Sequence, residues 1–137
     1  MLDAAATALA LPYPSLIKAI RELLLDPHVQ VPPRQVLSLP NGGKLLVMPA
    51  SDRTVAMTKL ITYVGDNPAR GLPTIQGNIV VFDALTGQHL STLHGPTVTA
   101  RRTAAVSVVA AQLLATRIDG PLLVVGAGVQ GRSHLET

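Results

Sequence analysis

Three glycines with the spacing Gly-x-Gly-x-x-Gly follow directly after a short apolar run. The run at residues 122–125 predicts a buried strand, and Gly126, Gly128 and Gly131 come where a helix should begin. In this order the first glycine permits a tight turn, the second a close backbone approach to a pyrophosphate, and the third close packing of helix on strand. The pattern therefore predicts a dinucleotide-binding turn that opens an α/β Rossmann unit.

The position of this pattern in the chain predicts a domain organisation. A complete site needs an acidic residue about 20 positions further on for the ribose, and parallel strands that cover the first one. The sequence stops at Thr137. We therefore expect an N-terminal part of a longer enzyme, with an incomplete first domain at 1–117 and the truncated start of a Rossmann domain at 118–137.

Composition narrows the class of protein. The net charge is +3, the basic residues are scattered and aromatic residues are scarce, which argues against a nucleic-acid-binding surface. Cysteine is absent and the four histidines lack ligand spacing, so we expect neither disulfides nor a metal site. The sequence shows neither a signal-peptide pattern nor an apolar run of about 18 residues, so we expect a cytoplasmic protein without a membrane partner.

Hydrophobic periodicity and turn residues predict that the first domain is α+β, an antiparallel sheet with helices. Ser15 is the expected cap of the first helix, and the segment Pro40-Asn41-Gly42-Gly43 is a hairpin signal. The expected helices are 14–25 and 99–116, and the expected strands are 34–39, 44–48, 55–63, 78–83 and 88–93.

Lys59 is the first candidate for a chemical role. In a strand it shares a face with Val55, Met57, Ile61 and Tyr63, which would leave its ammonium group partly desolvated. Such a group needs an anionic partner or a lowered pKa, so one interpretation is a contact with a substrate carboxylate or imine. The other interpretation is a lysine on an edge strand that extends its charge into solvent.

Two arginines, Arg101 and Arg102, open the long predicted helix. Helical spacing aligns Arg102 with the apolar residues Val106, Val109 and Leu113, so it is the better candidate to point inward. A guanidinium group at a helix N-terminus can bind a carboxylate through two hydrogen bonds. The alternative is a solvated basic turn.

Two further residues are weaker candidates. Arg34 follows two prolines, which would make its backbone rigid, but by itself it is also an ordinary surface arginine. Thr74 lies in a segment between Gly71 and Gly77 that offers a hydroxyl and an amide, or is an ordinary loop.

Several segments taken together resemble one family, the ornithine cyclodeaminase/mu-crystallin family. They occur in a fixed order and cover nearly the whole chain: 33–34 (Pro-Arg), 45–50 (Leu-Leu-Val-Met-Pro-Ala), 58–60 (Thr-Lys-Leu), 66–68 (Asp-Asn-Pro), 70–74 (Arg-Gly-Leu-Pro-Thr), 86–87 (Thr-Gly), 99–100 (Thr-Ala), 102–105 (Arg-Thr-Ala-Ala) and 126–131 (Gly-Ala-Gly-Val-Gln-Gly).

The resemblance implies an NAD(P)-binding Rossmann domain and a separate domain for substrate binding and homodimerisation. By resemblance, Arg34, Lys59 and Arg102 match positions that hold the substrate carboxylate and neighbouring groups, and Thr74 matches a substrate-side position less firmly. The positions that match the cofactor turn are Gly126, Gly128, Val129, Gln130 and Gly131. The family's catalytic aspartate would lie beyond Thr137, so no residue of this sequence is assigned that role.

The segment 66–77 is more similar to the ketimine reductases of the family than to its ornithine-cyclising members. This resemblance implies reduction of Δ1-pyrroline-2-carboxylate to proline, or of Δ1-piperideine-2-carboxylate to pipecolate, with NADPH or NADH. Two alternatives stay open. One is an ornithine cyclodeaminase that uses NAD and releases ammonia. The other is a non-catalytic dimerisation or interaction fragment.

Overall fold

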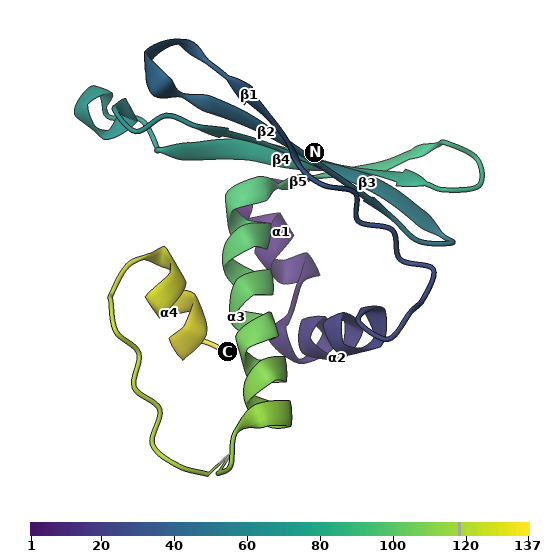
Figure 1. The fold of residues 1–137 in the computed structure, drawn as a ribbon, viewed down its shortest axis with the longest axis vertical. Coiled ribbons are helices and arrows are strands. Elements are labelled where there is room, and N and C mark those ends of the chain that lie inside the picture. Colours follow the sequence, from purple (N-terminus) through teal and green to yellow (C-terminus); the bar gives the residue numbers. More distant parts are fainter. Residues whose placement is uncertain (118) are drawn as a thin grey trace.

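The computed structural model describes residues 1–117 and 119–137. Ile118, where the predicted second domain begins, lies outside the described residues. A five-stranded antiparallel sheet forms one layer, and the helices lie on one side of it (Figure 1). The strands follow one another in chain order: β1 (Gln35–Ser38), β2 (Lys44–Ser51), β3 (Val55–Tyr63), β4 (Ile75–Asp83) and β5 (His89–His94).

Short turns explain why neighbouring strands pair in sequence order. Between β1 and β2, Asn41 and Gly42 take positive φ angles of 57° and 73°, as a tight turn requires. Between β2 and β3, one carboxylate oxygen of Asp52 accepts hydrogen bonds from the amides of Thr54 and Val55 at 2.7 Å each. The predicted antiparallel sheet is therefore confirmed, although β4 begins three residues earlier than expected.

Among the described residues, four α-helices accompany the sheet: α1 (Ala4–Ala10), α2 (Tyr13–Leu23), α3 (Gly95–Leu114) and α4 (Val129–Leu135). Helix α1 was not expected from the sequence, although Asp3 caps it by accepting a hydrogen bond from the Ala6 amide at 2.8 Å. The prediction that Ser15 caps the next helix is wrong, because α2 starts at Tyr13 behind Pro12 and has no side-chain cap. None of the helices in the described residues is long and apolar enough to cross a membrane.

The long helix α3 begins at Gly95, four residues before its predicted start. The imidazole of His94 caps it by accepting a hydrogen bond from the Thr97 amide, and Pro96 occupies its first turn, where a proline costs no hydrogen bond. Arg101 and Arg102 therefore lie beyond the first turn, which corrects the prediction that they open the helix.

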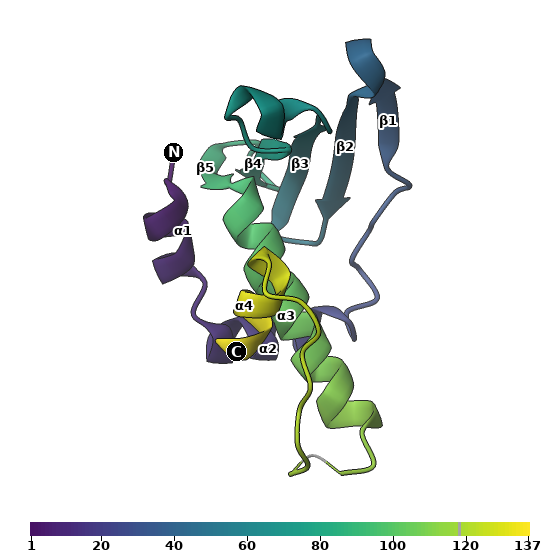
Figure 2. The ribbon, with the colours of Figure 1, turned by 90° about the vertical axis from the view of Figure 1, so that its left-hand side faces the viewer.

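Two glycines seat the first turn of α3 directly on the sheet. A methyl group at Gly95 would lie 2.6 Å from the Gly77 carbonyl oxygen and 3.1 Å from a side-chain carbon of Ile61. Gly77 itself has a φ of +149°, and a side chain there would overlap the Leu60 carbonyl oxygen. Only glycines allow this approach, so α3 meets β3 and β4 with its N-terminal end and extends away from the sheet (Figure 2).

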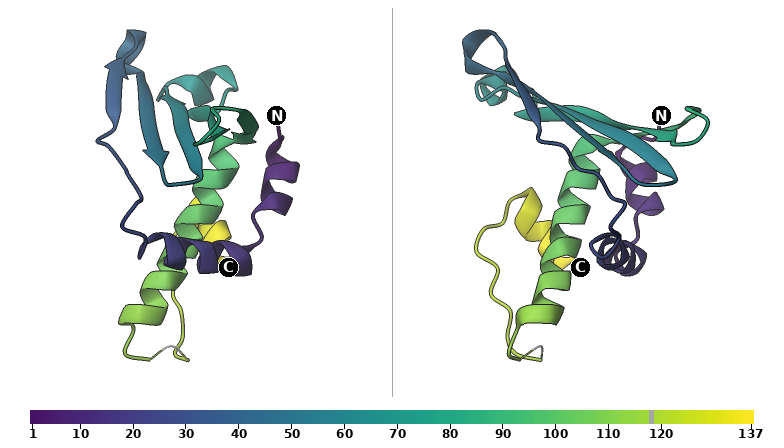
Figure 3. Two further views of the ribbon diagram at one scale, coloured as in Figure 1. Left: turned by 90° about the vertical axis from the view of Figure 1, so that its right-hand side faces the viewer. Right: turned by 45° about the vertical axis from the view of Figure 1, so that its right-hand side comes forward.

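The buried core is small and surrounds α3. Ile61 and Ile79 of the sheet are 6% and 2% exposed, and Ala104, Ala105 and Val109 of α3 are buried with them. An extended segment leads from α2 up to β1 (Figure 3). Gln30 pairs with Ser51 along this segment through backbone hydrogen bonds of 2.7 and 3.0 Å, so the backbone that carries Arg34 is tied to β2.

Residues 122–125 do not form the strand that was predicted for them. They run as a loop beside α3 (Figure 2), and Leu122, Leu123 and Val125 are 78%, 84% and 90% exposed. A strand needs a neighbour that accepts and donates its backbone hydrogen bonds. Within the described residues no strand lies beside this segment, so the start of a Rossmann sheet is not formed here.

The close approach of α3 to the sheet predicts a large penalty for a single methyl group. We expect Gly95→Ala to lower the free energy of unfolding by about 2–3 kcal/mol, because backbone atoms of Gly77 must move. Denaturant unfolding measures this loss. The control is Gly65→Ala, where the nearest atom lies 3.7 Å away. Equal losses in both variants would contradict this account of the packing.

Candidate functional site

A pocket of about 370 Å³ lies between the helix-facing side of the sheet and the first turns of α3. Four cationic side chains and several apolar ones form its wall, and we call it the cation pocket. Its lining residues are Arg34, Lys44, Leu46, Met48, Lys59, Ile61, Tyr63, Ile75, Thr99 and Arg102.

Strand register brings most of these side chains to one face. Lys59 of β3 pairs with Met48 of β2, and two residues further along Ile61 pairs with Leu46. Paired residues and residues two apart share a face of a sheet, so Lys59 lies among apolar neighbours. Arg34 enters from the segment before β1, which lies beside β2.

Lys59 sits on the central strand of the sheet, so the interpretation as a lysine on an edge strand is wrong. Burial lowers the pKa of its ammonium group from the ordinary value of 10.5, and the positive charges of Arg102 and Arg34 lower that pKa further. Both causes disfavour the charged form of Lys59, and an anion placed among the three groups would favour that form again.

Within the described part of the chain, no aspartate or glutamate lines the cation pocket to neutralise its positive charge. The ion pairs of the described residues are Lys18–Glu22 and Arg117–Asp119, and neither pair lines the pocket. A concave site with converging cations and an apolar wall is suited to bind a small organic anion, such as a carboxylate attached to an apolar ring.

Arg101 and Arg102 point to different surroundings. Arg102 lines the cation pocket, whereas the Arg101 guanidinium lies 3.8 Å from the Tyr13 ring centre and donates a 2.7 Å hydrogen bond to the Leu11 carbonyl. Of the apolar stripe expected beside Arg102, Val109 is buried but Val106 and Leu113 are exposed, so the stripe is not one continuous core face. Arg102 lines the pocket because it lies in the N-terminal part of α3, the part that is packed on the sheet.

The pocket contains residues that were not predicted for the site, and one predicted residue lies outside it. Lys44, Tyr63 and Thr99 line the cation pocket but were not proposed for it. Correct β2–β3 pairing would have found Lys44, which is opposite Tyr63. Thr74 does not line the pocket; its carbonyl accepts a hydrogen bond from the Val64 amide at 2.9 Å, and the next residue, Ile75, forms part of the wall.

The glycine turn is a second feature, separate from the cation pocket. Gly126 has a φ of +110°, and Gly128 is the N-cap residue of α4, with Val129 and Gln130 as the first residues of that helix. A side chain at Gly131 would overlap the Gly126 carbonyl oxygen. The turn thus has the tight geometry that the glycine pattern predicts, although its strand is missing.

Metal ligands do not gather in the described residues: no group of three or more histidine, cysteine, aspartate or glutamate side chains lies close enough to hold an ion.

Comparisons with known proteins place the chain among relatives of known activity. The family model described as ornithine cyclodeaminase/mu-crystallin family matches residues 7–137. The Delta(1)-pyrroline-2-carboxylate/Delta(1)-piperideine-2-carboxylate reductase of Azospirillum brasilense is 42% identical over 137 residues, which cover 98% of this chain and 44% of that protein. The chain therefore spans less than half the length of this relative.

Two solved structures are similar to the whole chain. The Thermococcus litoralis Delta(1)-pyrroline-2-carboxylate reductase, solved with NADH and L-proline, has a TM-score of 0.76 and 29% identity, over 98% of this chain and 41% of that one. A lysine cyclodeaminase, solved to explain recognition of L-lysine, L-ornithine and L-2,4-diaminobutyric acid, has a TM-score of 0.72 and 32% identity, over 96% and 42%.

The lowered pKa of Lys59 predicts a pH dependence of stability. The folded chain releases this proton at a lower pH than the unfolded chain, whose lysine keeps a pKa near 10.5. Between the two pKa values the unfolded state binds more protons, so the free energy of unfolding should rise as pH rises through this window.

We expect Lys59→Met to reduce this rise, as measured by urea midpoints at several pH values up to 10.5. Lys18→Met on the exposed face of α2 is the matched control and should keep it. A pH profile that is the same in Lys59→Met and in the unaltered chain would contradict the electrostatic description of the pocket.

Proposed function

The chain belongs to the ornithine cyclodeaminase/mu-crystallin family, and we propose that the whole protein containing these residues is an NAD(P)H-dependent ketimine reductase. Its substrates would be cyclic imino acids: Δ1-pyrroline-2-carboxylate, reduced to proline, and Δ1-piperideine-2-carboxylate, reduced to pipecolate. The name and the 42% identity of the Azospirillum reductase support this choice.

The cation pocket is the observation that carries the proposal. Arg34 comes from the segment before β1, Lys59 from β3 and Arg102 from α3, and among the described residues no acidic side chain lines the pocket with them. We assign them to the substrate carboxylate, with Arg102 suited to a two-point hydrogen-bonded contact. The apolar side chains beside them, such as Met48 and Ile61, would contact the carbon ring of the imino acid.

Fixing the carboxylate also orients the reacting C=N bond, since the carboxylate is attached to the imine carbon. A bound reduced nicotinamide cofactor would supply the hydride that this carbon accepts. The electron pair of the C=N bond then moves to nitrogen, which takes up a proton. Holding the ring in one orientation reduces the entropy lost on the way to this transition state, which is how the pocket contributes to the rate.

The glycine turn is our candidate for the cofactor pyrophosphate. Gly126 permits the turn, Gly128 leaves open space for a close approach, and the tight contact between Gly131 and Gly126 leaves no room for a side chain. The backbone amides of Val129 and Gln130 lie at the start of α4. The Thermococcus litoralis reductase structure contains NADH, which supports this part of the proposal.

The domain division is proposed on the same grounds. Residues 1–117 would form the domain for substrate binding and dimerisation, and 118–137 would begin the cofactor domain. The helices leave the second face of the sheet open (Figure 1). Leu37 of β1 and Leu60 of β3 are partly exposed. A homodimer that covers this face would remove apolar surface from water.

A cyclodeaminase is the second candidate function. It is favoured by the 32% identity and TM-score of 0.72 to the lysine cyclodeaminase structure. The cation pocket would hold an amino-acid carboxylate as readily as an imino-acid carboxylate. The two functions differ in redox balance, because the cyclodeaminase uses NAD without net reduction and releases ammonia.

The reductase activity is tested directly on the full-length protein. We expect Δ1-piperideine-2-carboxylate or Δ1-pyrroline-2-carboxylate to cause oxidation of NADPH or NADH, followed by the loss of absorbance of the reduced nicotinamide. Release of ammonia from L-ornithine without added reductant, together with no imine reduction, would replace this proposal with the cyclodeaminase.

Arg102 provides the residue-level test. We expect Arg102→Ala to raise the KM for the imino acid by about 10- to 100-fold, because a charge-assisted hydrogen bond to the carboxylate is lost, while the KM for the cofactor stays unchanged. Arg21→Ala, on the exposed side of α2, is the control and should leave both constants unaltered. An equal change in both KM values would argue against a carboxylate contact.

A further inference from the structure

We infer that Tyr13 is a positioning residue for the cofactor turn, and that it acts through Ser133 of α4. The inference rests on the proposed function, because it concerns the glycine turn that we assign to the cofactor. It adds a residue from the very start of the substrate-binding part that neither the sequence pattern nor the cation pocket includes.

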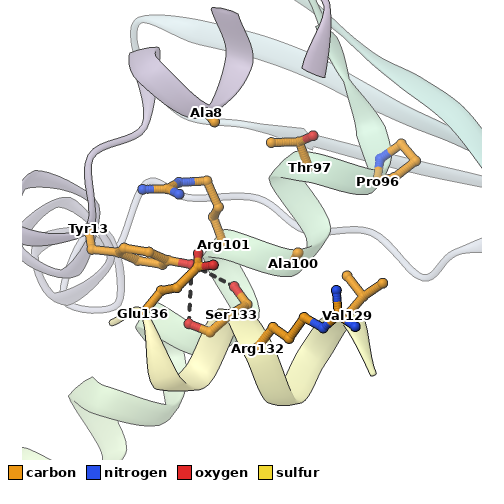
Figure 4. Close-up of a pocket in the computed structure, with 10 residues that line it drawn as sticks. All are labelled: Ala8, Tyr13, Pro96, Thr97, Ala100, Arg101, Val129, Arg132, Ser133 and Glu136. Carbon is orange, nitrogen blue, oxygen red and sulfur yellow. Dashed lines mark hydrogen bonds between the residues drawn. The ribbon is translucent and has the colours of Figure 1, made fainter. Parts of the chain in front are cut away.

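The contact joins residues far apart in the chain. The Tyr13 side chain is buried at the start of α2, and its hydroxyl lies 2.6 Å from the Ser133 hydroxyl and donates to the Ser133 carbonyl at 3.2 Å. Ser133 is itself 5% exposed. Figure 4 shows the two side chains meeting beside a cavity of about 320 Å³ between the helices.

Arg101 of α3 packs against the face of the Tyr13 ring. Its guanidinium group lies over the ring (Figure 4), 3.8 Å from the ring centre. It also donates a 2.7 Å hydrogen bond to the Leu11 carbonyl. A cation above the ring stabilises this orientation of the phenol. Arg101 of α3 therefore helps to keep the Tyr13 hydroxyl pointed at α4, and α3 itself is packed on the sheet at Gly95.

From Ser133 the contact continues to the glycine turn within one turn of α4. The neighbouring residue Arg132 donates from Nε to the Ala127 carbonyl at 3.2 Å, and Ala127 lies between Gly126 and Gly128. Gly131 packs against Gly126 without space for a side chain. A shift of α4 at Ser133 must therefore also shift the turn, because these contacts leave little freedom between them.

A second side-chain hydrogen bond between α4 and α3 is more exposed. His134 of α4 is 2.9 Å from the hydroxyl of Ser107 on α3, and this pair lies at the surface. Water competes for such a hydrogen bond, so it contributes less to the orientation of α4 than the buried bond of Tyr13. The buried pair is thus the main polar contact by which the substrate-binding part orients the turn.

The test uses Tyr13→Phe in the full-length protein, because this change removes the hydroxyl and keeps the ring under Arg101. We expect the dissociation constants of NADH and NADPH, measured by fluorescence titration, to rise by about 3- to 10-fold, as for the loss of one buried hydrogen bond. The KM for the imino acid at saturating cofactor should stay unchanged. Ser15→Ala, a hydroxyl removed from the exposed face of the same helix, is the matched control and should alter neither constant.

A double-mutant cycle separates this role from a general loss of stability. Ser133→Ala alone should weaken cofactor binding, and adding Tyr13→Phe to it should weaken binding by much less than the sum of the two effects. Hydrogen exchange of the amides in residues 126–135 gives a readout without substrate, and we expect faster exchange in Tyr13→Phe.

Two negative results have different meanings. Wild-type protein that binds neither nucleotide would overturn the proposed function and this inference with it. Wild-type protein that binds nucleotide, with Tyr13→Phe unchanged in affinity and in exchange at 126–135, would overturn the inference alone. Additive effects of the two substitutions would also overturn it, because the residues would then act independently.

Discussion

The close approach of Gly95 to Gly77 is the constraint on which the remaining structure depends. It brings the first turn of α3 against the backbone of the sheet, where any side chain at either position would collide with a carbonyl oxygen. With its end seated there, α3 presents Thr99 and Arg102 to the same space as Lys59 of the central strand. A helix held further from the sheet would leave these groups separated, and the cation pocket would not form.

One helix therefore serves two sites with neighbouring residues. Arg102 lines the cation pocket, and Arg101 lies over Tyr13 and thereby supports the contact with α4. The two arginines face different neighbours because successive helical residues lie about 100° apart around the axis. In our proposal, α3 thus contacts both the bound carboxylate, through Arg102, and the residue that positions the cofactor turn, through Arg101 and Tyr13. The concentration of positive charge around Lys59 opposes folding in the absence of an anion, which is a common cost of a binding site.

Much of the sheet could be predicted from the sequence because its signals are local. The predicted strand 55–63 coincides with β3, and the turn residues between strands have the conformations that such residues prefer. The start of α3 was missed because its cap is the histidine His94, a residue less usual in that position than serine or aspartate. Of the candidate site, Arg34, Lys59 and Arg102 were named from pattern and resemblance. Lys44 and Thr99 were not, because their place depends on register and on the seating of α3.

The sequence by itself determined the local conformations: the antiparallel hairpins, the positive φ of Gly126 and the lack of space at Gly131. Only the tertiary structure decided whether these segments find partners. Residues 122–125 have the composition of a buried strand but remain a loop, because a strand is stabilised by neighbours that the sequence of the segment does not contain. The lowered pKa of Lys59 likewise comes from burial and from Arg102 and Arg34, which are remote in the chain and adjacent only after folding. Side-chain electrostatics depend on distances in space, and these are set by how the helices and strands pack.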